Sequence, residues 1–112
     1  MAADYQAPVK DMRFVLDTVV DLDRIGELDG FETASRDTVD QILDEAAKFA
    51  GTVLAPINHD GDRQGARLVN GVVRMPDGFA DCYRQYVDAG WGSVTASPDH
   101  GGMGLPWSLN VA

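Results

Sequence analysis

Apolar residues recur along the chain at the spacing of three amphipathic helices. Between Asp11 and Leu22 they fall three or four positions apart, and the same spacing runs without a break from Asp37 to Leu54. The pattern predicts helices near residues 11–22, 36–55 and 78–89. Their apolar faces predict a core that is made of Phe14, Val39, Ile42, Leu43, Ala46, Phe49, Val53, Tyr83 and Tyr86.

Residues with strong backbone preferences mark where these helices begin and end. Ser35 is the expected N-cap of the second helix, because its hydroxyl accepts a hydrogen bond from an unpaired backbone N–H. Asp77 is expected to cap the third helix in the same way. Pro56 cannot donate to the helical ladder, so the second helix is expected to end at Leu54 or Ala55. Within that helix, Asp44 precedes Lys48 by four positions, which favours an ion pair.

The segments between the helices are rich in glycine and polar residues. We expect loops over 23–34 and 58–65, and a short extended stretch over 91–96. Asn70-Gly71, between two short apolar runs, is the pair preferred in a two-residue β-turn and predicts one small hairpin over 68–73. The fold class is therefore mainly α with one small β-hairpin.

Composition narrows the class of protein. Acidic residues number 18 and basic residues 9, which gives a net charge of −9. Such a surface repels phosphate backbones and anionic lipid, so we expect neither a nucleic acid nor a membrane as partner. The single cysteine, Cys82, allows no internal disulfide, and no signal peptide is visible, so we expect a cytoplasmic protein.

The glycine-rich stretch from Gly101 to Gly104 is the strongest candidate for ligand binding. A phosphate cradle is one interpretation, and a turn that leads into a helix at Pro106 is the other. The stretch has neither the glycine spacing of a dinucleotide fingerprint nor the lysine of a P-loop. The turn interpretation is therefore favoured.

The remaining candidates for chemistry are weak. Asn58, Asp60 and Asp62 alternate like the start of a calcium loop, but the glycine and the glutamate that such a loop requires are missing at its sixth and twelfth positions. His59 and His100 are interpreted as solvated loop histidines, and Cys82 as an inert buried thiol. A solvated acidic helix face is formed by Asp37, Asp40, Asp44 and Glu45. Trp91 and Trp107 are interpreted as core or interface anchors. We assign no catalytic, cofactor-binding or metal residue in this chain.

Several strings, in order, resemble the start of bacterial acyl-CoA dehydrogenases of the branch with an extra N-terminal helix. The strings are 5–8, 11–16, 42–49, 54–58, 61–65, 76–79, 90–91 and 98–106. The sequence is similar to the methylthiopropionyl-CoA dehydrogenases of that branch. Gly51 departs from the family, since it interrupts a helix at a cost of roughly 1 kcal/mol relative to Ala.

The resemblance implies the N-terminal helical domain of the acyl-CoA dehydrogenase fold. Residues 1–34 would form the extension helix and its loop, and residues 35–112 the helical domain, incomplete at its C-terminal end. The parent enzyme would be a homo-oligomer that uses FAD to oxidise the α,β carbons of an acyl-CoA and passes electrons to an acceptor. The family's carboxylate base and flavin-binding segments match no residue here.

Two functions follow as alternatives. One is the N-terminal segment of such an enzyme, which is inactive as an isolated chain and binds no FAD. The other is a stand-alone helical module that docks on a full-length relative.

Overall fold

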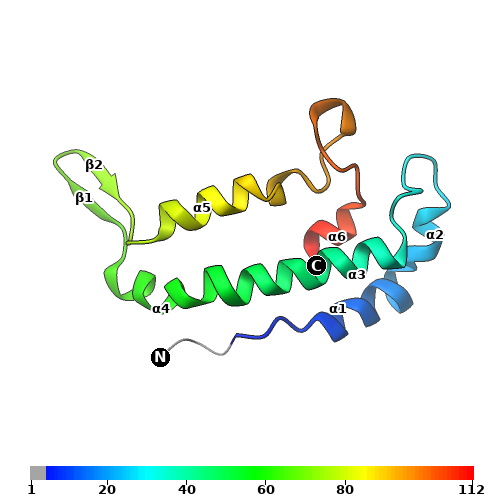
Figure 1. Ribbon diagram of the computed structural model, residues 1–112, viewed down its shortest axis with the longest axis horizontal. Coiled ribbons are helices and arrows are strands. Elements are labelled where there is room, and N and C mark those ends of the chain that lie inside the picture. Colours follow the sequence, from blue (N-terminus) through cyan, green and yellow to red (C-terminus); the bar gives the residue numbers. More distant parts are fainter. Residues whose placement is uncertain (1–4) are drawn as a thin grey trace.

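The computed structural model describes residues 5–112 of the chain. Figure 1 shows an elongated arrangement in which one long helical rod runs along the molecule and the other elements lie against it. The rod consists of α3 (Arg36–Phe49), a π-helical segment (Ala50–Leu54) and α4 (Ala55–Gln64). The first helix, α1 (Val9–Val15), lies on one side of the rod, and α5 (Phe79–Asp88) on the other.

The remaining elements join these helices. A π-helical segment (Leu16–Val20) connects α1 to α2 (Leu22–Gly26). The strands β1 (Arg67–Val69) and β2 (Val72–Arg74) form an antiparallel hairpin in which Leu68 faces Val73. Short 3₁₀ turns at Trp91–Ser93 and Pro98–His100 lead to α6 (Trp107–Val111).

Several predicted boundaries are confirmed. The Ser35 hydroxyl accepts a hydrogen bond from the backbone N–H of Thr38 and so caps α3. Asn70 and Gly71 both have positive φ, as the hairpin turn requires. Gly90 also has positive φ and follows the end of α5, and a short helix begins after Pro106.

Other predicted boundaries are wrong. The rod continues beyond Pro56, because a proline in the first turn of α4 lacks only an N–H that this turn does not need. The predicted loop over 58–65 is therefore helical as far as Gln64, and residues 23–26 of the predicted loop 23–34 belong to α2. Gly78, not Asp77, is the N-cap of α5, and residues 91–93 form a 3₁₀ turn where an extended stretch was expected.

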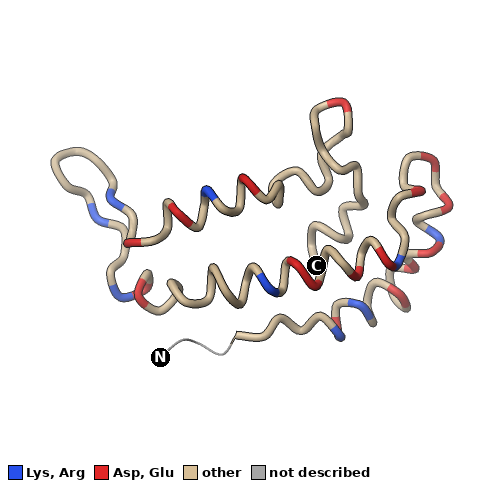
Figure 2. Tube along the Cα trace, in the orientation of Figure 1, with Lys and Arg blue, Asp and Glu red and all other residues tan. Residues whose placement is uncertain are grey.

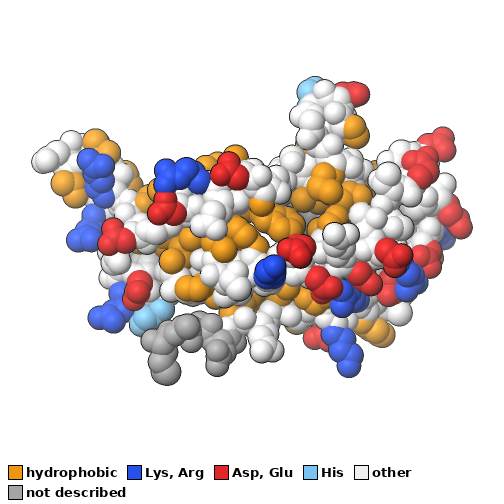
Figure 3. Space-filling view, in the orientation of Figure 1, with side chains coloured by type: hydrophobic (Ala, Val, Ile, Leu, Met, Phe, Trp, Pro, Cys, Tyr) orange, Lys and Arg blue, Asp and Glu red, His pale blue; other side chains and the backbone are white. Residues whose placement is uncertain are grey.

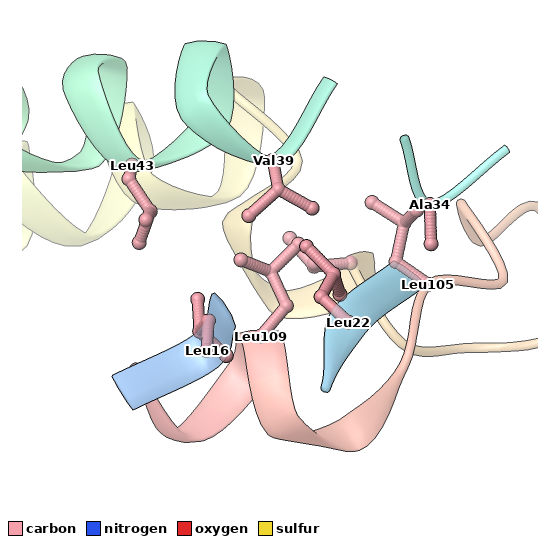
Figure 4. Packing of buried hydrophobic residues seen from close by; sticks show 8 residues of the cluster. Leu16, Leu22, Ala34, Val39, Leu43, Leu105 and Leu109 are labelled. Carbon is pink, nitrogen blue, oxygen red and sulfur yellow. The ribbon is translucent and has the colours of Figure 1, made fainter. Parts of the chain in front are cut away.

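The hydrophobic core lies at one end of the molecule. We call this the packed end: α1, α2, α6, the first half of α3 and residues 91–105. Figure 4 shows Leu16 of the π-helical segment, Leu22 of α2 and Leu109 of α6 grouped beneath Val39 and Leu43 of α3. The buried cluster consists of Leu16, Leu22, Ala34, Val39, Leu43, Val94, Leu105 and Leu109.

The opposite end is open, and we define it as α4, the hairpin and α5. Its closest packing is at Gly61, where an added Cβ would overlap the ring of Phe79, so the missing side chain lets α5 approach α4. The predicted core residues Tyr83 and Tyr86 lie here and are 68% and 38% exposed, because nothing in the described chain covers that face of α5. Phe14 of α1 was also predicted to be buried and is 64% exposed.

Candidate functional site

The glycine-rich loop from Gly101 to Gly104 is folded tightly onto the chain that precedes it. A Cβ at Gly102 would overlap the carbonyl group of Ala96, so only glycine permits this close approach. Gly101 and Gly104 have positive φ, which glycine adopts without strain. Each glycine in this loop is therefore explained by backbone geometry.

The backbone N–H groups of this loop are already used. Those of residues 101, 102 and 103 donate to the carbonyls of Pro98, Ser97 and Ser93 respectively. The N–H groups of Gly104 and Leu105 donate to Ala96 and Val94 at 2.9 and 3.1 Å. A phosphate cradle needs several free N–H groups that point at the ligand, and this loop offers none of these five.

The two tryptophans, Trp91 and Trp107, lie in different surroundings. Trp91 is half-buried and packs on Phe49, with the ring centroids 6.2 Å apart. Trp107 is 69% exposed at the start of α6. Because its donors are occupied, this loop does not fit a flavin pyrophosphate, and the turn interpretation is retained.

The other candidate residues lie in separate parts of the structure. His59 and His100 are exposed, the first on α4 and the second in a 3₁₀ turn. Cys82 is buried and its thiol donates to the carbonyl of Val53 at 3.4 Å. Asn58, Asp60 and Asp62 lie on α4, where alternate residues point in different directions, so they cannot wrap a calcium ion.

Among residues 5–112, no group of three or more His, Cys, Asp or Glu side chains is placed to hold a metal ion. Within the same residues, no helix is long and apolar enough to cross a membrane.

Two arginines tie the N-terminal helices to α3. Arg13 of α1 contacts Asp40 at 2.7 Å and Asp44 at 2.9 Å, so the predicted pairing of Asp44 with Lys48 is replaced by a contact between helices. The hydrogen bond to Asp40 raises the pKa of Arg13. Asp40 and Asp44 were predicted to be simply solvated, and they are instead partners in this junction.

The second arginine joins the far side of the same junction. Arg36, at the start of α3, contacts Asp17 at 2.9 Å and makes two hydrogen bonds to the carboxylate of Asp23. These bonds lower the pKa of Asp23 and raise the pKa of Arg36. In the neighbouring loop, backbone N–H groups, including that of Gly30, lower the pKa of Glu32.

An apolar groove lies between the rod and α5 and extends to the N-terminal segment and α6. Its inner part has a volume of about 280 Å³ and continues into an outer hollow of about 410 Å³, since both are lined by Leu54 and Tyr86. Figure 3 shows hydrophobic side chains along this strip of the surface. The other large residues of the groove include Ile42, Phe49, Trp91 and Leu109 inside, and Ile57, Phe79 and Tyr83 outside.

Sequence reasoning did not anticipate this groove, although four of the residues named above, Ile42, Phe49, Tyr83 and Tyr86, were predicted to be core. Trp91 adds one further feature, because its indole N–H is buried and has no acceptor among the described residues. A buried donor without a partner costs about 1–3 kcal/mol, so natural proteins rarely retain one. The groove is thus an apolar surface, and one of the residues that line it has a buried N–H without a partner among the described residues.

Comparison with known proteins identifies what this chain is related to. No protein-family model matches it. It is 39% identical over 96% of its length to 3-methylmercaptopropionyl-CoA dehydrogenase of Ruegeria pomeroyi, covering 18% of that protein. A butyryl-CoA dehydrogenase of Syntrophomonas wolfei is 27% identical over 96% of the chain, and the chain covers 18% of that protein. A second butyryl-CoA dehydrogenase of the same organism is 29% identical over 80% of the chain, which covers 15% of it. The chain thus spans less than a fifth of its relatives and is homologous to the N-terminal part of acyl-CoA dehydrogenases.

Proposed function

We propose that this chain is the N-terminal helical segment of an FAD-dependent enzyme that oxidises the α,β carbon–carbon bond of an acyl-CoA. The observation that carries the proposal is the 39% identity to 3-methylmercaptopropionyl-CoA dehydrogenase across nearly the whole chain. In such an enzyme a carboxylate removes the α proton and the flavin accepts the β hydrogen as hydride. The role of this chain is structural, because it packs against the remainder of the enzyme.

The shape of the chain supports a role as part of a larger body. Its radius of gyration is 16.9 Å, whereas a compact domain of this length has a value of roughly 13 Å. Its accessible surface is 8126 Å², whereas a compact protein of this mass exposes roughly 6,000 Å². A chain with this much surplus surface gains stability by packing against further polypeptide.

The groove supports the same conclusion. Its apolar lining suits a covering segment with an apolar face. A covering segment would remove exposed aromatic rings from water. We assign that cover to the remainder of the enzyme.

The experiment that tests this proposal is a chimera. This chain replaces the homologous segment of the Ruegeria pomeroyi enzyme, and acyl-CoA oxidation and flavin content are measured after purification. We expect the chimera to retain flavin and activity, and a version without the segment to lose both. A soluble chimera that holds no flavin would contradict the proposal.

A matched pair of variants locates the effect in the groove. Tyr86→Asp places a charge in the apolar groove and is expected to abolish flavin retention in the chimera. Gln85→Asp, one residue earlier and exposed, introduces the same charge outside the groove and is expected to retain activity. Equal effects of the two substitutions would argue against packing through the groove.

The isolated chain is expected to bind no FAD. Titration of the chain into FAD, followed by flavin fluorescence, is expected to show no saturable quenching. One-to-one quenching would refute this expectation and would assign cofactor binding to the segment itself.

The open groove also favours the second candidate, a module that docks on a full-length relative. The two functions are distinguished by mixing the isolated chain with the intact Ruegeria pomeroyi enzyme. A stable complex supports the module, because the intact enzyme already contains its own copy of the segment. Co-purification only with the enzyme that lacks this segment supports the first function.

A further inference from the structure

The hairpin carries apolar residues on both of its faces and projects from the open end (Figure 1). Five apolar side chains of the hairpin and the residue after it are between 45% and 74% exposed. They are those of Leu68, Val69, Val72, Val73 and Met75. A two-stranded ribbon with both faces in water is marginally stable at best. Such a hairpin gains stability when another surface covers it.

The charge of the hairpin narrows the kind of surface that fits. Arg67 and Arg74 lie directly opposite each other across the two strands, and such like-charged pairs are unfavourable. Neither arginine has an acidic partner within residues 5–112. From Arg63 to Met75 the chain contains three arginines and no acidic residue, so the hairpin fits an acidic surface with an apolar centre.

A surface of that kind exists at the packed end of this same chain. In the loop that follows α2, Leu28 is 55% exposed and lies between Glu27 and Asp29. With Glu32, residues 27–33 contain three acidic residues and no basic one. Figure 2 shows the basic hairpin and this acidic loop at opposite ends of the molecule.

The positions of the two surfaces permit a closed arrangement. The hairpin and the acidic loop lie at opposite ends of the 53 Å long axis and on the same side of the rod (Figure 1). A two-fold rotation about an axis perpendicular to the long axis exchanges the two ends. Each hairpin of a pair is then placed at the other copy's acidic loop, so the same contact forms twice.

We infer that the hairpin is a docking surface for a second copy of this chain, with Arg67 and Arg74 against Glu27 and Asp29, and with Leu68 and Val73 against Leu28. This inference is independent of the proposed function, since both surfaces belong to this chain. The contact is electrostatic at its rim and apolar at its centre. Its strength therefore falls as ionic strength rises.

Charge reversal tests the pairing directly. The 112-residue chain is examined by light scattering and sedimentation at concentrations up to about 100 μM, where micromolar contacts are populated. We expect a dimer for the unaltered chain. The variant R67E/R74E reverses the charge of the hairpin, and E27K/D29K reverses the charge of the loop. Each is expected to raise the dissociation constant of the dimer about 100-fold.

The combined variant with all four substitutions is decisive. It has the same net charge as the unaltered chain, and its two surfaces are again complementary with the signs exchanged, so dimer formation is expected to return. The control D60K/D62K makes the same charge change as E27K/D29K on α4, away from the loop, and is expected to remain dimeric. Circular dichroism verifies that each variant is folded.

Three results would overturn the inference. An unaltered chain that is monomeric at the highest concentration has no such contact, and the hairpin then faces another part of an enzyme or a different protein. A dimer that survives both reversals uses another face. A four-substitution variant that stays monomeric, although folded, shows that these two surfaces do not pair.

Discussion

The packed end buries eight apolar side chains, which come from the π-helical segment after α1, from α2, α3 and α6, and from the loops before α3 and α6. The open end leaves most of its apolar side chains exposed. The two ends have similar helices and similar apolar stripes. The packed end differs because segments distant in sequence converge there, and Leu109 of α6 meets Leu16 and Val39. Helix formation and core formation are thus separate events in this chain.

The largest expected effect is at the centre of the packed end. Leu22 is 1% exposed, so Leu22→Ala removes buried methyl groups and leaves a cavity, with an expected loss of about 3–4 kcal/mol. Val87→Ala at the open end is the control, since this side chain is 53% exposed and its loss is expected to be below about 0.5 kcal/mol. Urea unfolding measures both. Equal losses would show that the two ends are stabilised alike.

A smaller effect is expected in the loop that completes the packed end. Gly102→Ala brings a Cβ onto the carbonyl of Ala96, so the loop must shift and the expected loss is about 2–3 kcal/mol. Gly92→Ala is the control, because its added Cβ finds only ordinary contact distances. An unchanged unfolding midpoint for Gly102→Ala would mean that the loop does not hold this conformation.

The sequence predicted the helices better than it predicted what covers them. Periodicity identified Val39 and Leu43 correctly, because they lie on the one stripe that α1 and α6 cover. The same periodicity placed Phe14, Tyr83 and Tyr86 in the core, although it reports only that a face is apolar. Leu105 and Ala34 were missed because they lie outside any periodic helix, and their burial depends on loops that fold back.

The candidate site was predictable in part. The absence of a phosphate-binding spacing around Gly101 favoured a turn, and the hydrogen bonds of the loop agree with that interpretation. The groove was not predictable, because it depends on the distance at which α5 is held from the rod. Pro56 was misread, since the effect of proline depends on its position within a helical turn.

The open end provides a sharper test through Tyr83. In the isolated chain this side chain is 68% exposed, so Tyr83→Ala is expected to change the stability by less than about 0.5 kcal/mol. In the chimera described above, the same substitution is expected to cost more, about 1–3 kcal/mol, if the ring becomes covered. Thermal unfolding of the isolated chain and of the chimera, each with and without Tyr83→Ala, supplies the comparison. An equal, small cost in both would show that this part of the groove stays open.

The smallest expected effect concerns the junction of α2 and α3. The Arg36 hydrogen bonds lower the pKa of Asp23 from its ordinary value of 3.8, so the contact stabilises the folded chain above that pH and is lost as the pH falls through the lowered pKa. A carboxyl-carbon NMR titration is expected to show a midpoint below 3.8. In Arg36→Gln the midpoint should return toward the ordinary value. An identical midpoint in both proteins would show that this pairing is not maintained in solution.

The π-helical segment at Ala50–Leu54 fixes the rotational setting of everything that follows it in the rod. Each residue turns an α-helix by about 100°, and a wide turn accommodates one extra residue without breaking the helix. Deletion of one residue from this segment would restore an ordinary helix and swing α4 by about that angle. Gly61 would then no longer face Phe79. Natural variants of this segment should therefore tolerate substitutions in the wide turn far more readily than changes in its length.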